Sequence, residues 1–199
     1  MSTYTKTQGT SVLSLQTVAS GAVLLSSAID VSTVIAATMF IHFGREIATA
    51  LTVGAQFRIE ASSKSSGDGH WYPLFIYITD IAAASDEAVS GTVNAGTNVI
   101  TVAATAGFVA GDIIFIQNGT IGNSEWGRVK SIVTNTSVTI EDNLVNAQTG
   151  ATMYDQAQIF RAVDINCRAL GRLRLVVDNT GTGQAIAVEA HVVTADSFA

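Results

Sequence analysis

The chain has 199 residues, of which 48% are hydrophobic and only 13% are charged, with 10 Lys and Arg against 16 Asp and Glu. A typical soluble domain is about 25% charged, and disordered chains combine low hydrophobicity with high net charge, so this composition argues against disorder. One Pro and one Cys exclude collagen and disulfide scaffolds. The net charge of −6 argues against nucleic-acid binding, which requires a basic surface.

The sequence predicts no membrane span. Its most apolar run, Val34–Phe43, is ten residues long, whereas a transmembrane helix requires about 20. The preceding stretch, Val12–Ala28, is interrupted by polar residues and makes a poor signal peptide. The lone Cys167 excludes an internal disulfide, and we expect it to be a buried small side chain.

Composition and periodicity both predict β-strands. The chain contains 21 Val, 18 Ile and 23 Thr against 10 Leu, and β-branched residues favour the pleated sheet. Taken in chain order, Gln56–Glu60 alternates polar and apolar residues, Leu74–Ile78 is apolar on both faces, and Arg172–Leu175 and Ile186–Val192 alternate again. A strand that is apolar on both faces is typical of one buried on both sides or at an interface.

The connections carry turn signals. Residues 62–69 form a Ser- and Gly-rich loop, and the Asn- and Gly-rich segment Asp178–Gln184 is expected to be a hairpin loop between the last two strands. A short helix is expected over Asp80–Ala88.

Residues 89–155 have a strand-and-turn rhythm of their own. Short strands are expected at 98–103, 113–117, 126–134, 137–141 and 151–154. We therefore predict an all-β fold: a jelly-roll-like β-sandwich, built from residues 11–88 and 156–199, that is interrupted by a small inserted β-barrel or β-sandwich domain at 89–155. The Ser- and Thr-rich residues 1–10 are expected to be an N-terminal arm.

Catalytic motifs are not found in the sequence. Gly122–Gly127 resembles a nucleophile elbow but has one residue too many, and it reads better as a turn. No phosphate-binding Gly-Lys-Ser/Thr motif occurs, and His42, His70 and His191 do not have metal-ligand spacing. We predict no catalytic residues, no metal site and no cofactor.

Two groups of side chains are candidates for binding. Four of the seven arginines form a cluster suited to an acidic partner surface, because Arg pairs with carboxylates and is enriched at interfaces; the alternative is that they are ordinary outward-facing strand residues. These are Arg161, Arg168, Arg172 and Arg174. The aromatic residues that could stack on a glycan or a partner, or else anchor strand ends, are His70, Trp71, Tyr72 and Trp126.

Several segments resemble structural proteins of tailed-phage virions. In the outer framework they are Ile41–Arg45, Phe57–Ser63, Gly69–Leu74 and Leu173–Gly181, and in the insert they are Ala106–Ile116, Glu125–Val133 and Leu144–Ala147. The resemblance implies a capsid decoration or cement protein with a jelly-roll core, of a class that commonly forms trimers on the shell and carries no catalytic residues.

The leading hypothesis is therefore a non-enzymatic virion protein, made in the host cytoplasm, that binds the major capsid protein at the capsid surface and stabilises the shell. It would form a homo-oligomer, with a trimer favoured, and would bind neither nucleic acid nor membrane. The alternative is a carbohydrate-binding or adhesion module of a tail fibre or spike. A hydrolase with unrecognised spacing is the third hypothesis.

Overall fold

Two antiparallel sheets form a β-sandwich in the computed structural model, which describes residues 9–67 and 70–196. In the first sheet the strand order is β1 (Thr10–Val18), β17 (Ile186–Asp196), β4 (Val34–Arg45) and β15 (Gln158–Asn166). In the second it is β2 (Val23–Leu25), β16 (Arg172–Asp178), β5 (Gln56–Ser62) and β6 (Tyr72–Ile78), and the two-residue β3 (Ile29–Asp30) also pairs with β16. Residues 1–8, on which most of the predicted arm falls, lie outside the described residues.

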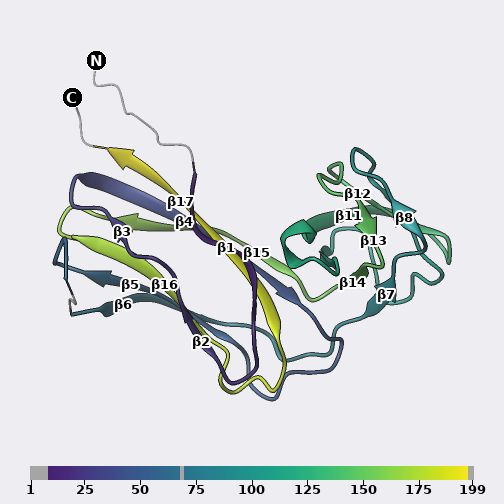
Figure 1. The fold of residues 1–199 in the computed structure, drawn as a ribbon, viewed down its shortest axis with the longest axis horizontal. Helices are drawn as coiled ribbons and strands as arrows, with labels where there is room; N and C mark the ends of the chain where they lie inside the picture. The colour runs from purple at the N-terminus through teal and green to yellow at the C-terminus, as the bar shows by residue number, and fades with distance from the viewer. Residues whose placement is uncertain (1–8, 68–69, 197–199) are drawn as a thin grey trace.

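The connectivity is that of a jelly roll. The chain places β1 in the first sheet, β2 in the second, β4 in the first, β5 and β6 in the second, and then β15, β16 and β17 in alternate sheets. Eight strands are thereby wound into two sheets of four, with the short β3 added to the second, and the two sheets form the left part of the molecule in Figure 1. The predicted all-β sandwich is confirmed.

One predicted connection is wrong. Residues 178–184 do not form a hairpin, because they join β16 of the second sheet to β17 of the first. The turn-forming residues identify the loop but do not show which sheet its following strand enters. Asn179 fixes this crossing from a fully buried position: its Nδ2 donates to the carbonyl oxygens of Val18, Ala19 and Gln184 at 2.9, 3.1 and 2.8 Å.

The sandwich core lies between the two sheets. Alternate residues of each strand face it, including Phe57 and Ile59 of β5 and Leu173 and Leu175 of β16, all of which are fully buried. Cys167 is buried in this core, as expected, and burial raises the pKa of its thiol.

Residues 86–154 connect β6 to β15 and form sheets of their own. The six-stranded sheet follows the order β7 (Asp86–Ala88), β14 (Thr152–Tyr154), β10 (Ile113–Gln117), β11 (Glu125–Val133), β12 (Ser137–Ile140) and β9 (Val99–Thr101). The other strands are β8 (Thr92–Val93) and β13 (Gln148–Thr149), and a 3-10 turn, η1, spans Ile121–Asn123. A separate core, which includes Ile100, Ile114 and Met153, fills this insert. The helix expected over Asp80–Ala88 is wrong, because the segment ends in β7.

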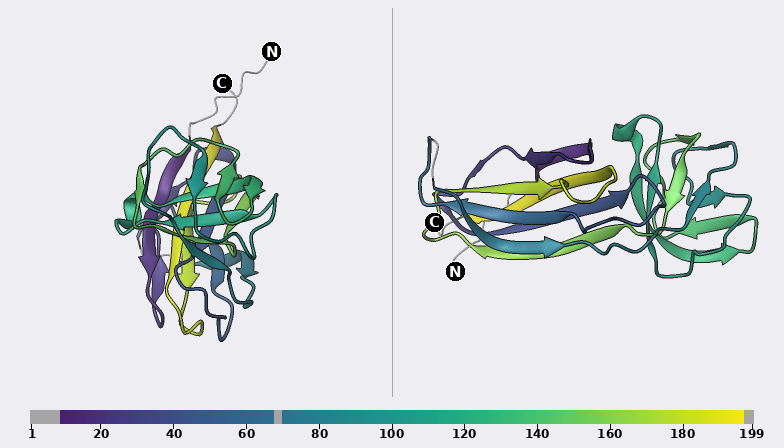
Figure 2. Two further views of the ribbon diagram at one scale, coloured as in Figure 1. Left: turned by 90° about the vertical axis from the view of Figure 1, so that its right-hand side faces the viewer. Right: turned by 90° about the horizontal axis from the view of Figure 1, so that it is seen from below.

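The insert extends the molecule lengthwise (Figure 2) and packs on one end of the jelly roll. The chain enters and leaves it at adjacent points, since Asp155 donates its backbone N–H to Ser85 O at 3.1 Å and accepts the Ser85 N–H on Oδ1 at 2.6 Å. At the contact, the buried Phe115 of β10 packs with Ala157 and Ala187 of the jelly roll. A Cβ atom at Gly44 of β4 would overlap the Phe115 ring. The expectation that residues 89–155 are an independent domain stays a prediction.

Candidate interaction surface

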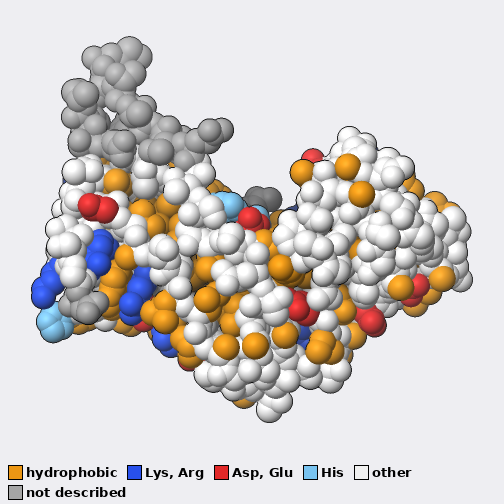
Figure 3. All heavy atoms as spheres, viewed as in Figure 1, with side chains coloured by type: hydrophobic (Ala, Val, Ile, Leu, Met, Phe, Trp, Pro, Cys, Tyr) orange, Lys and Arg blue, Asp and Glu red, His pale blue; other side chains and the backbone are white. Residues whose placement is uncertain are grey.

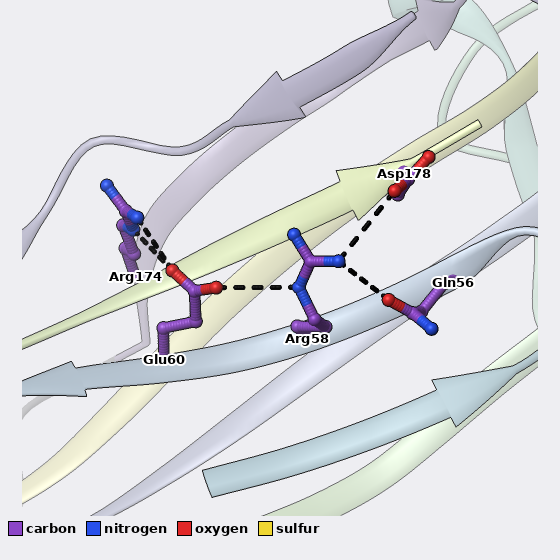
Figure 4. A network of polar contacts seen from close by, with 5 residues as sticks. All are labelled: Gln56, Arg58, Glu60, Arg174 and Asp178. Carbon is purple, nitrogen blue, oxygen red and sulfur yellow. Dashed lines mark hydrogen bonds and ion pairs between the residues drawn. The ribbon is translucent and has the colours of Figure 1, made fainter. Parts of the chain in front are cut away.

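The outer face of the second sheet carries a ladder of charged side chains. Arg174 of β16 lies opposite Glu60 of β5, and its Nε and Nη2 both donate to Glu60 Oε2, at 2.8 and 2.7 Å. Arg58 Nε lies 3.4 Å from Glu60 Oε1, so the carboxylate is held between two guanidinium groups (Figure 4). Such charge-assisted contacts fix both side chains in one geometry.

The ladder continues toward the insert. Arg58 Nη1 donates to Gln56 Oε1 at 2.7 Å and lies 3.7 Å from Asp178 Oδ2 (Figure 4). Hydrogen bonds from the side chain and backbone of Thr180 lower the pKa of the Asp178 carboxyl, and Arg58 contributes a smaller effect in the same direction. The central strands of this face are therefore polar and internally paired.

At the end away from the insert, two of the predicted groups come together. The guanidinium carbons of Arg172 and Arg174 lie 5.1 and 4.2 Å from the ring centroid of Trp71, which is within cation–π distance. Arg172 also donates from Nε to Lys64 O at 3.0 Å and from Nη2 to Gly67 O, which ties residues 64–67 to β16. Sequence reasoning did not place these arginines next to Trp71.

The other residues predicted for binding are exposed or lie in other parts of the molecule. Arg168 is exposed in the loop after β15, and His70 and Tyr72 are exposed beside Trp71. The side chain of Arg161 falls outside the described part of the structure. Trp126 does not join the other aromatic residues: its Nε1 donates to Phe43 O at 2.9 Å, and its ring packs 4.9 Å from that of Phe115, at the contact between insert and jelly roll.

A groove of about 370 Å³ runs beside Trp126. Leu15, His42, Glu125, Asn146 and Glu189 are among its lining residues. Glu189 Oε1 lies 2.9 Å from His191 Nε2, and Oε2 lies 3.4 Å from His42 Nδ1. The pKa of Glu189 is lowered, chiefly by His42 and further by His191, against the opposing effect of burial. The alternation over Ile186–Val192 puts Glu189 and His191 on one face of the strand, but sequence spacing gave no sign that His42 joins them, because that contact depends on the pairing of β4 with β17.

Charge is distributed unevenly along the molecule. Five of the ten Lys and Arg lie within residues 58–64 and 168–174, whereas residues 89–155 contain five Asp and Glu and two Lys and Arg. In Figure 3 the blue side chains gather at the end of the jelly roll opposite the insert. We call this the basic end; it contains Lys64, Arg168, Arg172 and Arg174. Such an arrangement favours an acidic partner there.

No group of three or more His, Cys, Asp or Glu among residues 9–67 and 70–196 is arranged to hold a metal ion. Within those ranges, no helix is long and apolar enough to cross a membrane.

The fold places the chain in the class of jelly-roll proteins, with an insert between β6 and β15, the fifth and sixth of its eight main sandwich strands. No family model matches the sequence, and no curated protein matches it.

Two similar solved structures are capsid proteins or virus particles. VP17, a capsid protein of bacteriophage P23-77, is 12% identical with a TM-score of 0.20, over 98% of this chain and 100% of that one. A structure of infectious bursal disease virus, Gt strain, is 9% identical with a TM-score of 0.23, over 96% of this chain and 41% of that one, so this chain spans less than half of it. Because both TM-scores lie below 0.5, these likenesses assign neither fold nor function here.

Proposed function

We propose that this chain is a non-enzymatic structural protein of a virion, which binds the capsid surface and stabilises the shell as a decoration or cement protein. The observation that carries the proposal is the uneven distribution of charge along the molecule: four of its ten Lys and Arg, together with Trp71, lie at one end of a chain with a net charge of −6. The basic end would contact acidic groups of the major capsid protein, and the insert would project away from the shell.

The jelly-roll core and the segments that resemble phage virion proteins support the same function. Part of the positive charge is already paired, since Arg174 is held by Glu60 and Arg172 by loop carbonyls. The more exposed Lys64 and Arg168 are therefore the cations best placed to reach a partner. Exposed charges act mainly on the rate of association and its salt dependence.

The test is co-sedimentation of the purified protein with undecorated capsid shells. We expect saturable binding that raises the temperature at which the shells disrupt. The double variant Lys64→Glu/Arg168→Glu should bind about tenfold more weakly at about 0.15 M salt and show a flatter salt dependence. Lys130→Glu, an exposed charge reversal in the insert, should bind like the wild type.

Absence of wild-type binding would contradict the decoration function. Equal weakening by Lys130→Glu and by the double variant would show that net charge acts, and would contradict the assignment to the basic end.

Carbohydrate binding is the second candidate function, and the Trp126 groove is the observation that favours it. An aromatic ring beside Glu125, Asn146 and Glu189 offers both a stacking surface and hydrogen-bond acceptors for sugar hydroxyl groups. Specific signals on a glycan array that Asn146→Ala removes would favour this function over shell binding.

A further inference from the structure

The strand β6 presents an apolar outer row at an open sheet edge. Within the described residues β6 pairs only with β5, so its other side leaves backbone groups without a strand partner. Ile76 and Ile78 lie opposite Arg58 and Gln56 and share their outward face, and Leu74, Ile76 and Ile78 are 48, 52 and 55% exposed. Tyr72, which lies beyond a register shift and opposite Ala61, is 61% exposed. The adjacent β5 presents Gln56, Arg58 and Glu60 on the same face, so the apolar row is a property of the edge strand alone.

Edge strands of soluble proteins usually carry charges that prevent pairing with another chain. No charged residue occurs in Tyr72–Ile78. The single protective feature is Pro73 at its beginning, next to a register shift between Ile59 and Glu60 of β5. The segment from Leu74 to Ile78 has no such protection, which indicates that it is covered in the working state of the protein.

We propose that two copies of this chain pair through β6, antiparallel across a two-fold axis at Ile76. The backbone direction supports this register. Thr79 donates its N–H to Ala55 O, toward β5, and because successive residues of a strand point to opposite sides, the N–H and C=O groups of Ile78 and Ile76 point to the open edge. Pairing Ile76 with its counterpart places Leu74 opposite Ile78 of the second copy, with all these side chains on one face.

Charge complementarity supports a second copy as the occupant. In this register Tyr72 lies opposite Asp80 of the second copy, because the two positions are equally distant from Ile76. Tyr72 follows Trp71, which lies against Arg172 and Arg174 of the basic end, so the exposed Asp80 of the second copy would lie near the positive charge of this end. Both arginines are also hydrogen-bonded within their own chain, so the attraction is one between the regions and not a new ion pair. Because of the two-fold axis, the same attraction occurs at both ends of the paired strands.

The apolar surface at β6 is also large enough for a dimer interface. Five exposed side chains could each bury about 100 Å²: Tyr72, Leu74, Ile76, Ile78 and Ile81, the last of which is 50% exposed. Two copies would therefore bury roughly 1,000 Å², which is in the lower range for a specific interface. The pairing would join the two second sheets into one continuous sheet, and main-chain hydrogen bonds would add affinity, as in other cases of strand addition.

Light scattering on a sizing column tests this inference with the full chain alone, so it is independent of shell binding. We expect a dimer mass for the wild type at micromolar concentrations and a twofold lower mass for Ile76→Lys. Val133→Lys is the matched control, because Val133 is 57% exposed on β11 of the insert, and it should remain dimeric. Circular dichroism must show both variants folded.

A cross-linking experiment tests the register. In a Cys167→Ala background, Ile76→Cys should be linked into dimers by a short bismaleimide, and Val133→Cys should not. A wild-type monomer, or a trimer whose mass is unchanged by Ile76→Lys, would overturn the proposal, as would equal cross-linking of the two cysteine variants.

Discussion

Asn179 shows how one side chain holds a crossing between sheets. Its amide reaches the carbonyl oxygens of Val18 and Ala19 at the end of β1 and of Gln184 before β17, which are both strands of the first sheet. Ala19 O also accepts the Ala22 N–H, and Gln184 O also accepts the Thr182 hydroxyl, so the Asn179 amide adds a further donor at both carbonyls. The side chain therefore ties the loop after β16 to the end of β1 and the start of β17.

The substitution Asn179→Asp keeps the size of the side chain and replaces the donor with a carboxylate that faces three carbonyl oxygens. We expect it to lower the free energy of unfolding by about 3 kcal/mol or more at pH 7, because a buried charge without a counterion is strongly destabilising. Urea denaturation measures this. Asn143→Asp, at an exposed position, is the control and should change stability by less than about 0.5 kcal/mol. Equal effects would show that Asn179 is not a structural anchor.

Individual strands were predicted from the sequence more accurately than their partners. The expected strand 113–117 coincides with β10, and 126–134 and 137–141 match β11 and β12 within one residue at each end. Alternation reveals a strand because it reflects which face is buried. The short β7, β8 and β13 were missed, since two or three residues cannot show a period.

The candidate surface was predicted only in part, because alternation shows which side chains face outward but not which strands pair. Alternation correctly turned Arg58 and Glu60 outward, but the pairing of Arg174 with Glu60 joins residues 114 positions apart and depends on the register of β16 and β5. The approach of Trp71 to Arg172 and Arg174 likewise requires the β5–β6 pairing that brings β6 beside them. Register between distant strands is set by the whole core, not by local pattern.

The contact between β4 and β10 depends on the absence of a side chain at Gly44. We expect Gly44→Ala to cost about 1–3 kcal/mol, because its methyl group would overlap the Phe115 ring in a packed site. Thermal denaturation measures the loss, and Gly119→Ala, which has open space around its Cβ, is the control. In the double variant Gly44→Ala/Phe115→Leu, the combined loss should be smaller than the sum of the single losses. Additive losses would contradict direct contact.

At the scale of the whole molecule, the insert and the jelly roll have separate cores and adjoining chain crossings. We expect replacement of residues 87–154 by a short Gly-Ser linker to leave a folded jelly roll that unfolds cooperatively, because the two ends already lie side by side. Its stability should fall, since the surface covered by Phe115 becomes exposed. Circular dichroism during thermal denaturation tests this, and loss of cooperative unfolding would contradict an independent domain.

The position of β17 has a consequence for the order in which the protein folds. It is the last of the described strands, yet it lies between β1 and β4 in the first sheet, and Thr10 pairs with Val192. On the ribosome, β1 must therefore wait until residues 186–196 have emerged before it can pair. The insert contains only contiguous sequence, so it can fold while synthesis continues, and non-local pairing of this kind makes folding slow. The first strand of the jelly roll is therefore synthesised before the insert, but the jelly roll completes its folding after the insert does.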